Sequence, residues 1–207
     1  RAAAELFGGG GDGVAVLAEA SSSPTRARLR AAFLAARPGA RWYEYEPVSR
    51  DAERVGTRLA FGEPLRIRVD LAQAAVVACL DADPLFDHPA ALQMARGFAA
   101  ARDPEHGAGA RLYVAESSYS LTGARADHRV AVAAGRVPAL LVQVARRLVA
   151  EHGLELPAAA SSFAALPAAP GSEREQHFVD LLADDLAAHR GSSAVLVGPR
   201  QAPAVHA

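Results

Sequence analysis

Three apolar segments of this chain end in the same way, in a polar turn that leads into a helix start containing proline. The segments are residues 14–18, 76–80 and 195–197, and the prolines that follow them are Pro24, Pro84 and Pro199. Strands that alternate with helices predict a parallel sheet with helices on both faces. Residues 76–80 are apolar without alternation, which is typical of a central strand buried on both faces. We therefore predict an α/β fold, a three-layer, mostly parallel Rossmann-like sheet.

The charged residues exclude several classes of function. The 207 residues include 22 basic and 23 acidic side chains, and every basic one is an arginine. A chain without lysine cannot carry out phosphate chemistry that depends on a lysine side chain. A net charge near zero argues against a broad basic surface for nucleic acid, so we predict no nucleic-acid partner.

The lengths of the apolar runs and the cysteine content limit the possible functions further. The longest apolar runs fall short of the about 20 residues that a membrane-spanning helix needs, so we predict no direct membrane insertion. Cys79 is the only cysteine in the sequence. These residues therefore form no internal disulfide and cannot ligate an iron–sulfur cluster by themselves.

Capping residues mark several of the expected helices. Ser23 and Pro24 are typical of the N-cap and first position of a helix. Gly153 follows a stretch with helical apolar spacing and is expected to end that helix. Ser172 and Glu175 have the spacing of a capping box, in which each side chain accepts a hydrogen bond from the other residue's backbone N–H.

Two further stretches are assigned from periodicity. Residues 49–60 have the spacing of a helix, and the side chains expected to face inward are Ala52, Val55 and Leu59. Residues 157–170 are rich in alanine, serine and proline without a period, so we expect a surface connection there.

The chain is expected to contain one main domain. Glycines at 8–11 and 13 precede the first strand, whereas a phosphate-binding loop follows a strand, so residues 1–13 are interpreted as a flexible lead-in. Residues 14–190 are assigned to the α/β domain, and residues 191–207 to the truncated start of a further βα unit. Because the sequence begins at Arg1 rather than methionine, we interpret it as part of a longer protein.

Paired carboxylates after the central strand are the best local sign of an enzyme. Asp81 and Asp83 could hold a divalent cation, as paired carboxylates do in phosphatases. Such phosphatases also need a hydroxyl residue soon afterwards and a lysine, but Pro84 follows here. We therefore expect Asp83 and Asp87 to act as capping acids near the start of the next helix, which is predicted from Pro89.

Histidines and serines suggest no further catalytic site. The histidines are scattered without the i, i+4 spacing of a zinc-binding helix, so no metal ligand is predicted. They are His88, His106, His128, His152, His177, His189 and His206, and on helix surfaces solvated side chains are expected. The serines at 21–23 lack the Gly-x-Ser-x-Gly elbow, and no dinucleotide fingerprint follows the first strand. No catalytic residue is predicted.

Residues 112–130 resemble the molybdopterin oxidoreductase family. Thr122, Ala126 and Asp127 match its Thr-x-Thr-Ala and Ala-Asp positions, and Asp83 stands where its Gly-x-Asn-Pro loop has asparagine. Two departures fall on residues that contact the pterin nucleotide in that family. Glu116-Ser117-Ser118 replaces Asp-Pro-Arg, and Ala-Ala-Gly-Arg at residues 133–136 replaces Pro-Gly-Thr-Asp, so an arginine fork and a carboxylate are lost.

A closer similarity covers nearly the whole chain. It is to the molybdopterin-like domain of the iron–sulfur subunit of alternative complex III and related quinol-oxidising respiratory complexes. The collinear stretches that carry it are residues 19–25, 45–51, 81–83, 120–124 and 198–201. The resemblance implies a subunit exported by a twin-arginine signal to the periplasmic face of the bacterial inner membrane. It also implies iron–sulfur clusters in a downstream domain of the same chain.

The resemblance leads to one main functional hypothesis. The chain is expected to be a non-catalytic scaffold domain of an electron-transfer subunit, with no cofactor of its own. Its implied partners are the iron–sulfur domain of the same parent chain and the cytochrome and integral-membrane subunits of the complex. The positions of the vacated pterin crevice are Ser21, Ser22, Asp83, Ser117, Ser118, Thr122 and Asp127.

Two alternatives remain open from the sequence. The first is a functional domain that binds molybdopterin guanine dinucleotide through backbone groups, partly at helix N-termini. The second is a metal-dependent hydrolase that uses Asp81 and Asp83.

Overall fold

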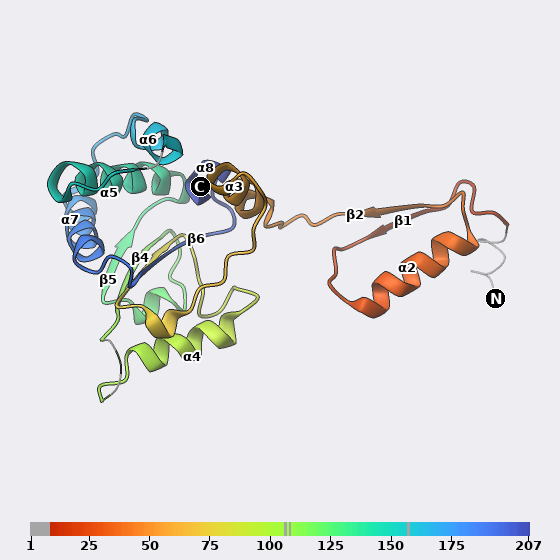
Figure 1. The fold of residues 1–207 in the computed structure, drawn as a ribbon, viewed down its shortest axis with the longest axis horizontal. Coiled ribbons are helices and arrows are strands. Elements are labelled where there is room, and N and C mark those ends of the chain that lie inside the picture. Colours follow the sequence, from red (N-terminus) through yellow and green to blue (C-terminus); the bar gives the residue numbers. More distant parts are fainter. Residues whose placement is uncertain (1–8, 106, 108, 157) are drawn as a thin grey trace. The chain divides into compact units, whose positions relative to one another are not determined.

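The computed structural model describes residues 9–105, 107, 109–156 and 158–207 (Figure 1). The chain divides into two compact units, Arg1–Ser49 and Arg50–Ala207. The first eight residues of the expected lead-in lie outside the described residues. Within the described ranges, no helix is long and apolar enough to cross a membrane.

The first unit is a single βαβ motif. Its strands β1 (Ala15–Ala18) and β2 (Arg41–Glu44) are parallel and are joined through helix α2 (Pro24–Ala36). The Ser23 hydroxyl accepts a hydrogen bond from the Arg26 N–H at 3.4 Å. The predicted N-cap is therefore confirmed.

The second unit is built on a four-stranded sheet. Its strands are β3 (Val76–Leu80), β4 (Arg111–Glu116), β5 (His128–Ala131) and β6 (Ser193–Val197). They are all parallel and lie in the order β5-β4-β3-β6. Every residue of β3 is buried, as expected for a central strand. The chain is an α/β protein with a Rossmann-like parallel sheet, as predicted.

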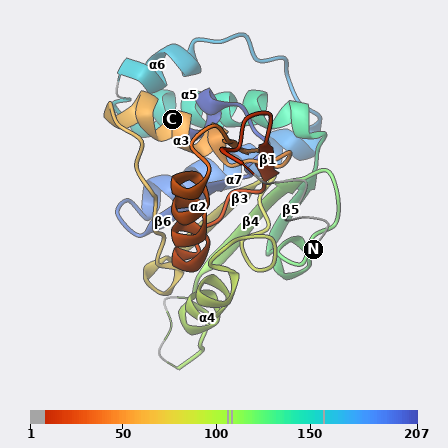
Figure 2. The same cartoon turned by 90° about the vertical axis from the view of Figure 1, so that its right-hand side faces the viewer.

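Helices cover both faces of this sheet (Figures 1 and 2). Helix α4 (Ala91–Ala101) packs Met94 and Phe98 on one face. Helices α5 (Val137–His152) and α7 (Glu173–Ala188) cover the other face, where the side chains that bury the sheet include Leu140 and Leu182. Helix α3 (Asp51–Phe61) packs on the short helix α8 (Pro203–His206). The 3₁₀ turns are Leu71–Gln73, Gly123–Arg125 and Ala134–Arg136.

The caps of α5 and α7 follow the sequence. Gly153 ends α5 in a left-handed conformation, with φ of 60°. The Ser172 hydroxyl accepts a hydrogen bond from the Glu175 N–H at 3.3 Å. The Glu175 carboxylate instead binds Arg136, with Oε2 3.1 Å from the guanidinium. The serine hydrogen bond of the predicted capping box is thus formed, and the glutamate hydrogen bond is replaced by an ion pair with Arg136.

Helix α3 buries a different face from the predicted one. Val55 and Leu59 are 42% and 57% exposed, whereas Gly56 and Thr57 are buried. A Cβ atom on Gly56 would lie 2.4 Å from the Cβ of His206, so the glycine allows α8 to approach the α3 backbone. The expected inward positions of Val55 and Leu59 were wrong because the buried side of α3 instead carries Gly56, which lies against α8, and Thr57, whose hydroxyl accepts a hydrogen bond from the Leu65 N–H at 3.0 Å.

Two segment assignments also differ from the structure. Residues 158–164 form helix α6 (Ala158–Ala164), where we expected an irregular connection. Alanine favours a helix without an amphipathic pattern, so periodicity gave no signal there; Pro157 lies outside the described residues. Strand β6 pairs with β3 in the same sheet, so residues 191–207 belong to the second unit, and the chain divides instead after Ser49.

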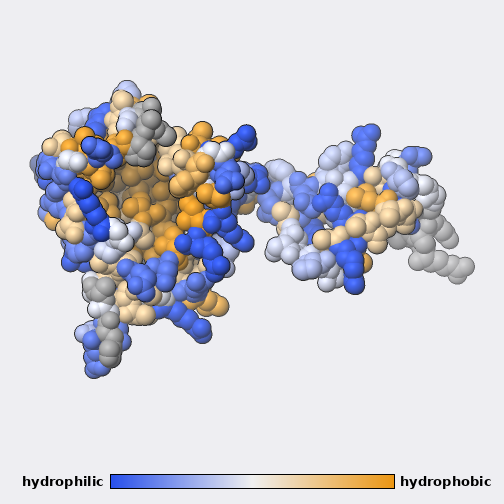
Figure 3. All heavy atoms as spheres, in the orientation of Figure 1, coloured by the Kyte–Doolittle hydropathy of each residue, from blue (hydrophilic) through white to orange (hydrophobic). Residues whose placement is uncertain are grey.

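Strand β6 is covered less completely than β3. Val195 is 47% exposed, although the strand carries no charged residue. Figure 3 shows hydrophobic atoms gathered in a hollow below α5 on the face of this unit drawn in Figure 1. The outer strand β6 therefore presents surface that no described element covers fully.

A carboxylate on α7 fastens the helix to the amino-terminal edge of the sheet. Asp185 accepts hydrogen bonds from Arg111 Nε at 2.5 Å and from the Tyr113 hydroxyl at 2.5 Å. Burial raises the pKa of Asp185, but the hydrogen bonds from Arg111 and Tyr113 and the arginine charge lower it by more, so the net shift is downward.

This arrangement predicts acid-sensitive stability. A carboxyl group with a lowered folded pKa stabilises the fold above its unfolded pKa of about 3.9, and this contribution is lost as the pH falls through the folded pKa. We expect the free energy of unfolding to decrease below about pH 4. The variant Asp185→Asn should be less stable at neutral pH and should lose less stability on acidification. Urea unfolding from neutral to acidic pH measures both, and parallel pH profiles for the two proteins would contradict the assignment.

Candidate functional site

The candidate site lies at the carboxyl ends of β3 and β6. Strands β4 and β5 continue the sheet on one side of β3, and β6 lies on its other side. The strand order therefore reverses between β3 and β6, and in open α/β sheets ligands bind beside the strand ends at such a switch point. The loop that follows β3 begins at Asp81, and the turn that follows β6 begins at Gly198.

The backbones of these two loops touch directly. Asp81 has a φ of 55°, and a Cβ atom on Gly198 would lie only 1.8 Å from the Asp81 carbonyl oxygen. The Gln201 side-chain amide donates to Asp81 Oδ2 at 3.0 Å and to the Ala134 carbonyl oxygen at 3.0 Å. The Asp81 carboxylate thus ties the β3 loop to the segment after β6.

Asp83 binds the loop that follows β4. Its Oδ1 accepts hydrogen bonds from the Thr122 N–H at 3.0 Å and from the Thr122 hydroxyl at 2.5 Å. Thr122 is fully buried, and its hydroxyl also accepts a hydrogen bond from the Leu85 N–H at 3.2 Å. The structure therefore brings together two of the predicted crevice residues, and they bind each other.

The expected capping role of the acidic residues was wrong. Helix α4 begins at Ala91, and its N-cap residue Ala90 makes no side-chain capping bond. Asp83 lies in the preceding turn, where its carbonyl oxygen accepts a backbone hydrogen bond from Asp87 at 2.8 Å. The Asp83 carboxylate is used instead to hold Thr122.

Strand β4 ends in a buried glutamate, Glu116. Glu116 is 4% exposed and accepts hydrogen bonds from Arg129 Nε at 2.6 Å and from the Ser120 hydroxyl at 2.5 Å. The Ser120 hydroxyl in turn accepts from the Gly123 N–H at 2.8 Å, and the Arg129 guanidinium lies 4.4 Å from the centre of the Tyr119 ring. This network fixes the β4 loop internally.

The serines of the predicted crevice fall in two different units of the chain. Ser117 and Ser118 are exposed on the β4 loop. Ser21 and Ser22 belong to the first unit, where the Ser21 hydroxyl accepts a hydrogen bond from the Ser23 N–H at 3.2 Å.

Asp127 lies at the opposite edge of the sheet from Asp83. It precedes β5 and accepts a hydrogen bond from the Leu112 N–H, at the start of β4, at 2.8 Å. Arg102 donates to its two carboxylate oxygens at 2.6 and 2.9 Å. Burial raises the pKa of Asp127, but the bonds from Arg102 and Leu112 outweigh it and lower the pKa. Asp127 therefore does not share a crevice with Asp83 and Thr122.

A small cavity of about 120 Å³ lies at the switch point. Its lining includes Ile67, Asp83, His88, Leu196 and His206. Burial is the main cause that lowers the pKa of both His88 and His206, which favours neutral imidazoles there. The sequence alone did not single out either histidine, because His88 precedes α4 and His206 lies on α8, and the two line one cavity only in the folded unit.

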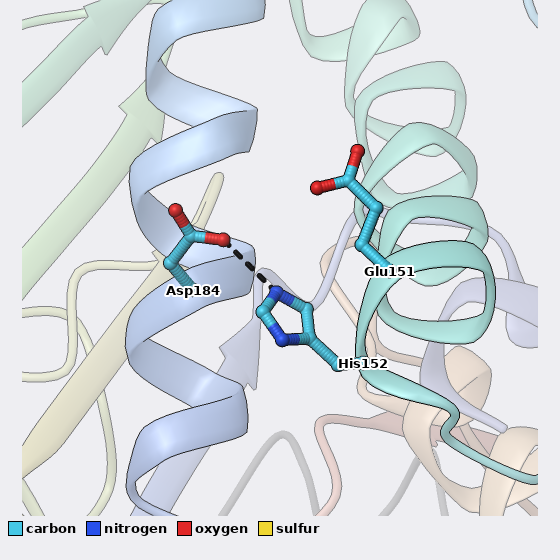
Figure 4. Close-up of side chains that lie close together, drawn as sticks. All are labelled: Glu151, His152 and Asp184. Carbon is cyan, nitrogen blue, oxygen red and sulfur yellow. Dashed lines mark hydrogen bonds and ion pairs between the residues drawn. The ribbon is translucent and has the colours of Figure 1, made fainter.

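A second cluster of polar side chains lies between helices α5 and α7 (Figure 4). Glu151 and His152 on α5 and Asp184 on α7 place ligand atoms within 4.8 Å of one another, and His152 Nε2 lies 2.9 Å from Asp184 Oδ1. Arg147 lies 3.0 Å from Glu151 Oε2 and 3.6 Å from Asp184 Oδ1. The guanidinium already supplies the positive charge that an ion would bring, so the cluster is an ion-pair network between α5 and α7. His152 is paired rather than freely solvated as we expected.

Comparison with known protein families and with curated proteins gives no match to this chain.

Proposed function

We propose that this chain is a non-catalytic scaffold domain, related to molybdopterin oxidoreductases, within an iron–sulfur electron-transfer subunit of a quinol-oxidising respiratory complex. The collinear sequence resemblance supports the family. The observation that supports the scaffold role is that polar side chains at the expected ligand site bind other residues of the chain. Asp81 is hydrogen-bonded to Gln201, and Asp83 is hydrogen-bonded to Thr122. These hydrogen bonds connect the loops to one another and leave few free polar side chains to bind a nucleotide.

The residues at the switch point do not fit a pterin dinucleotide. Pockets for ligands of this class are typically about 300–1,000 Å³, and the cavity beside β3 and β6 is about 120 Å³. In its lining, Asp83 is hydrogen-bonded to Thr122 and Arg50 to Glu53, whereas the buried His206 Nε2 has no hydrogen-bond partner among the described residues. The arginine of the family's Asp-Pro-Arg motif is replaced by Ser118.

Partners and location follow from the same resemblance as parts of the proposal. The domain would dock the cluster-bearing domain of its parent chain together with cytochrome and integral-membrane subunits. The complex would lie at the periplasmic face of the bacterial inner membrane after twin-arginine export. A docking role is favoured by a well-ordered surface. The hydrogen-bonded loops that follow β3, β4 and β6 would supply one at the carboxyl edge of the sheet.

One experiment tests the scaffold proposal against both alternatives. The purified chain is analysed for molybdenum, for extractable pterin fluorescence and for magnesium-dependent hydrolysis of a phosphate monoester. We expect molybdenum and pterin far below one per chain and no turnover above the blank. Stoichiometric molybdenum with pterin would overturn the proposal in favour of a cofactor-binding domain. Turnover abolished by Asp81→Asn would favour the hydrolase, although Asp81 and Asp83 belong to no trio of close metal-ligand atoms among the described residues.

A further inference from the structure

The outer edge of β5 is open and faces a groove. Strand β5 is the last strand in the order β5-β4-β3-β6, and within the described part of the chain it pairs only with β4. Backbone N–H and C=O groups on the outer side of an edge strand have no ladder partner. A groove of about 430 Å³ runs beside this edge, between β5 and α7. A strand-like ligand would find both unpaired backbone groups and space for side chains there.

The floor of the groove is apolar and tightly packed. Val130 on β5 and Phe178 on α7 line it and are only 6% and 4% exposed. Tyr113 on β4 contacts both α7 and β5, since its ring packs edge-on against Phe178 at 5.8 Å and stacks on His128 at 4.6 Å between ring centres. Leu181 extends the apolar wall by one turn of α7. This floor is therefore suited to apolar side chains from an extended segment.

The rim of the groove is basic. Arg174 and His177 lie on the α7 side, are exposed and make no hydrogen bond or ion pair with any described residue. Asp127 is the acidic residue of the lining, and Arg102 already neutralises it through two hydrogen bonds. The positive charge available to a ligand is thus that of Arg174, and His177 adds an imidazole that can hydrogen-bond a carboxylate. Complementary charge steers and orients a partner.

We propose that an extended acidic segment of a partner protein adds to β5 as a further strand. Its backbone would bond to the open edge, since peptides bind exposed sheet edges in this way. Alternate side chains of a strand point to the same face, so every second residue would enter the groove. Apolar side chains would pack on Val130 and Phe178, and carboxylates would pair with Arg174 and His177. This inference rests on the proposed docking role and names the chemistry of one partner.

The test uses the whole chain and a labelled peptide of alternating valine and glutamate. Fluorescence anisotropy should show saturable binding that weakens with added salt. The charge reversal Arg174→Glu should weaken it by about tenfold, because it replaces attraction at the rim with repulsion. The matched control is Arg96→Glu, an exposed arginine on α4 at the other face of the sheet, which should bind as the unmodified chain does. A peptide of alternating valine and arginine should not bind.

The location of binding is checked by hydrogen exchange. Backbone amides of His128–Ala131 should exchange more slowly with the peptide present, while amides of β6 should not change. Absent binding, equal weakening by Arg174→Glu and Arg96→Glu, or protection at β6 in place of β5 would each overturn the inference. Failure of the scaffold proposal has a different signature, since it appears as bound molybdenum and pterin whether or not the peptide binds.

Discussion

Replacing Glu116 with alanine is expected to destabilise the second unit by about 3–5 kcal/mol, the usual cost of removing one partner of a buried ion pair. The Glu116 side chain is 5% exposed and receives hydrogen bonds from Arg129 and Ser120. Without the carboxylate, the Arg129 guanidinium, whose side chain is 24% exposed, loses its anionic partner. The measurement is the free energy of unfolding from urea titration.

A surface ion pair provides the matched control for Glu116→Ala. Arg54 and Asp51 also form a short contact, at 2.6 Å, but their side chains are 66% and 63% exposed. Exposed pairs contribute about 0–1 kcal/mol, so Arg54→Ala should change the free energy of unfolding by less than about 1 kcal/mol. If the two substitutions had equal effects, the Glu116 network would not hold the β4 loop as the geometry indicates.

The sheet could be predicted where the sequence signal was strong. The uninterrupted apolar run of β3 and its polar turn located a buried central strand correctly. Strand β5 was missed because its four residues include His128 and Arg129, and neither a buried run nor a clear alternation marks it. Its pairing with β4 gives the segment its structure, and this contact is not local in sequence.

Missing β5 also misplaced one candidate residue. Asp127 precedes that strand, so it lies at the amino-terminal edge of the sheet, whereas Asp83 follows β3 at the carboxyl edge. Asp83 and Thr122 both follow strands, and the structure indeed joins them. Residues could therefore be assigned to one edge only when the strand beside them had been recognised.

The candidate site itself depends on contacts that a single sequence does not reveal. Gln201 reaches Asp81 across 120 positions of the chain, and His206 lies beside Gly56 because α8 packs on α3. The glycine at position 56 was the available signal for this close approach, since a helix interior rarely favours glycine without a packing reason. Val55 and Leu59 suggested the opposite face, and their exposure shows that apolar periodicity alone did not decide which side of α3 is buried.

Replacing Gly198 with alanine should destabilise the second unit by about 3 kcal/mol or more, which is the upper end of the usual cost of overpacking. The added Cβ would lie 1.8 Å from the Asp81 carbonyl oxygen, and this oxygen belongs to backbone that the Asp81 N–H ties to the Ala115 carbonyl oxygen at 2.7 Å. Gly135→Ala is the control, because a Cβ there meets nothing within 4 Å. We expect a midpoint of thermal unfolding lower by about 6–12 °C for Gly198→Ala and nearly unchanged for Gly135→Ala. Equal midpoints would show that the loops after β3 and β6 can move apart at little cost. The scaffold proposal, which depends on a closed switch point, would then lose its support.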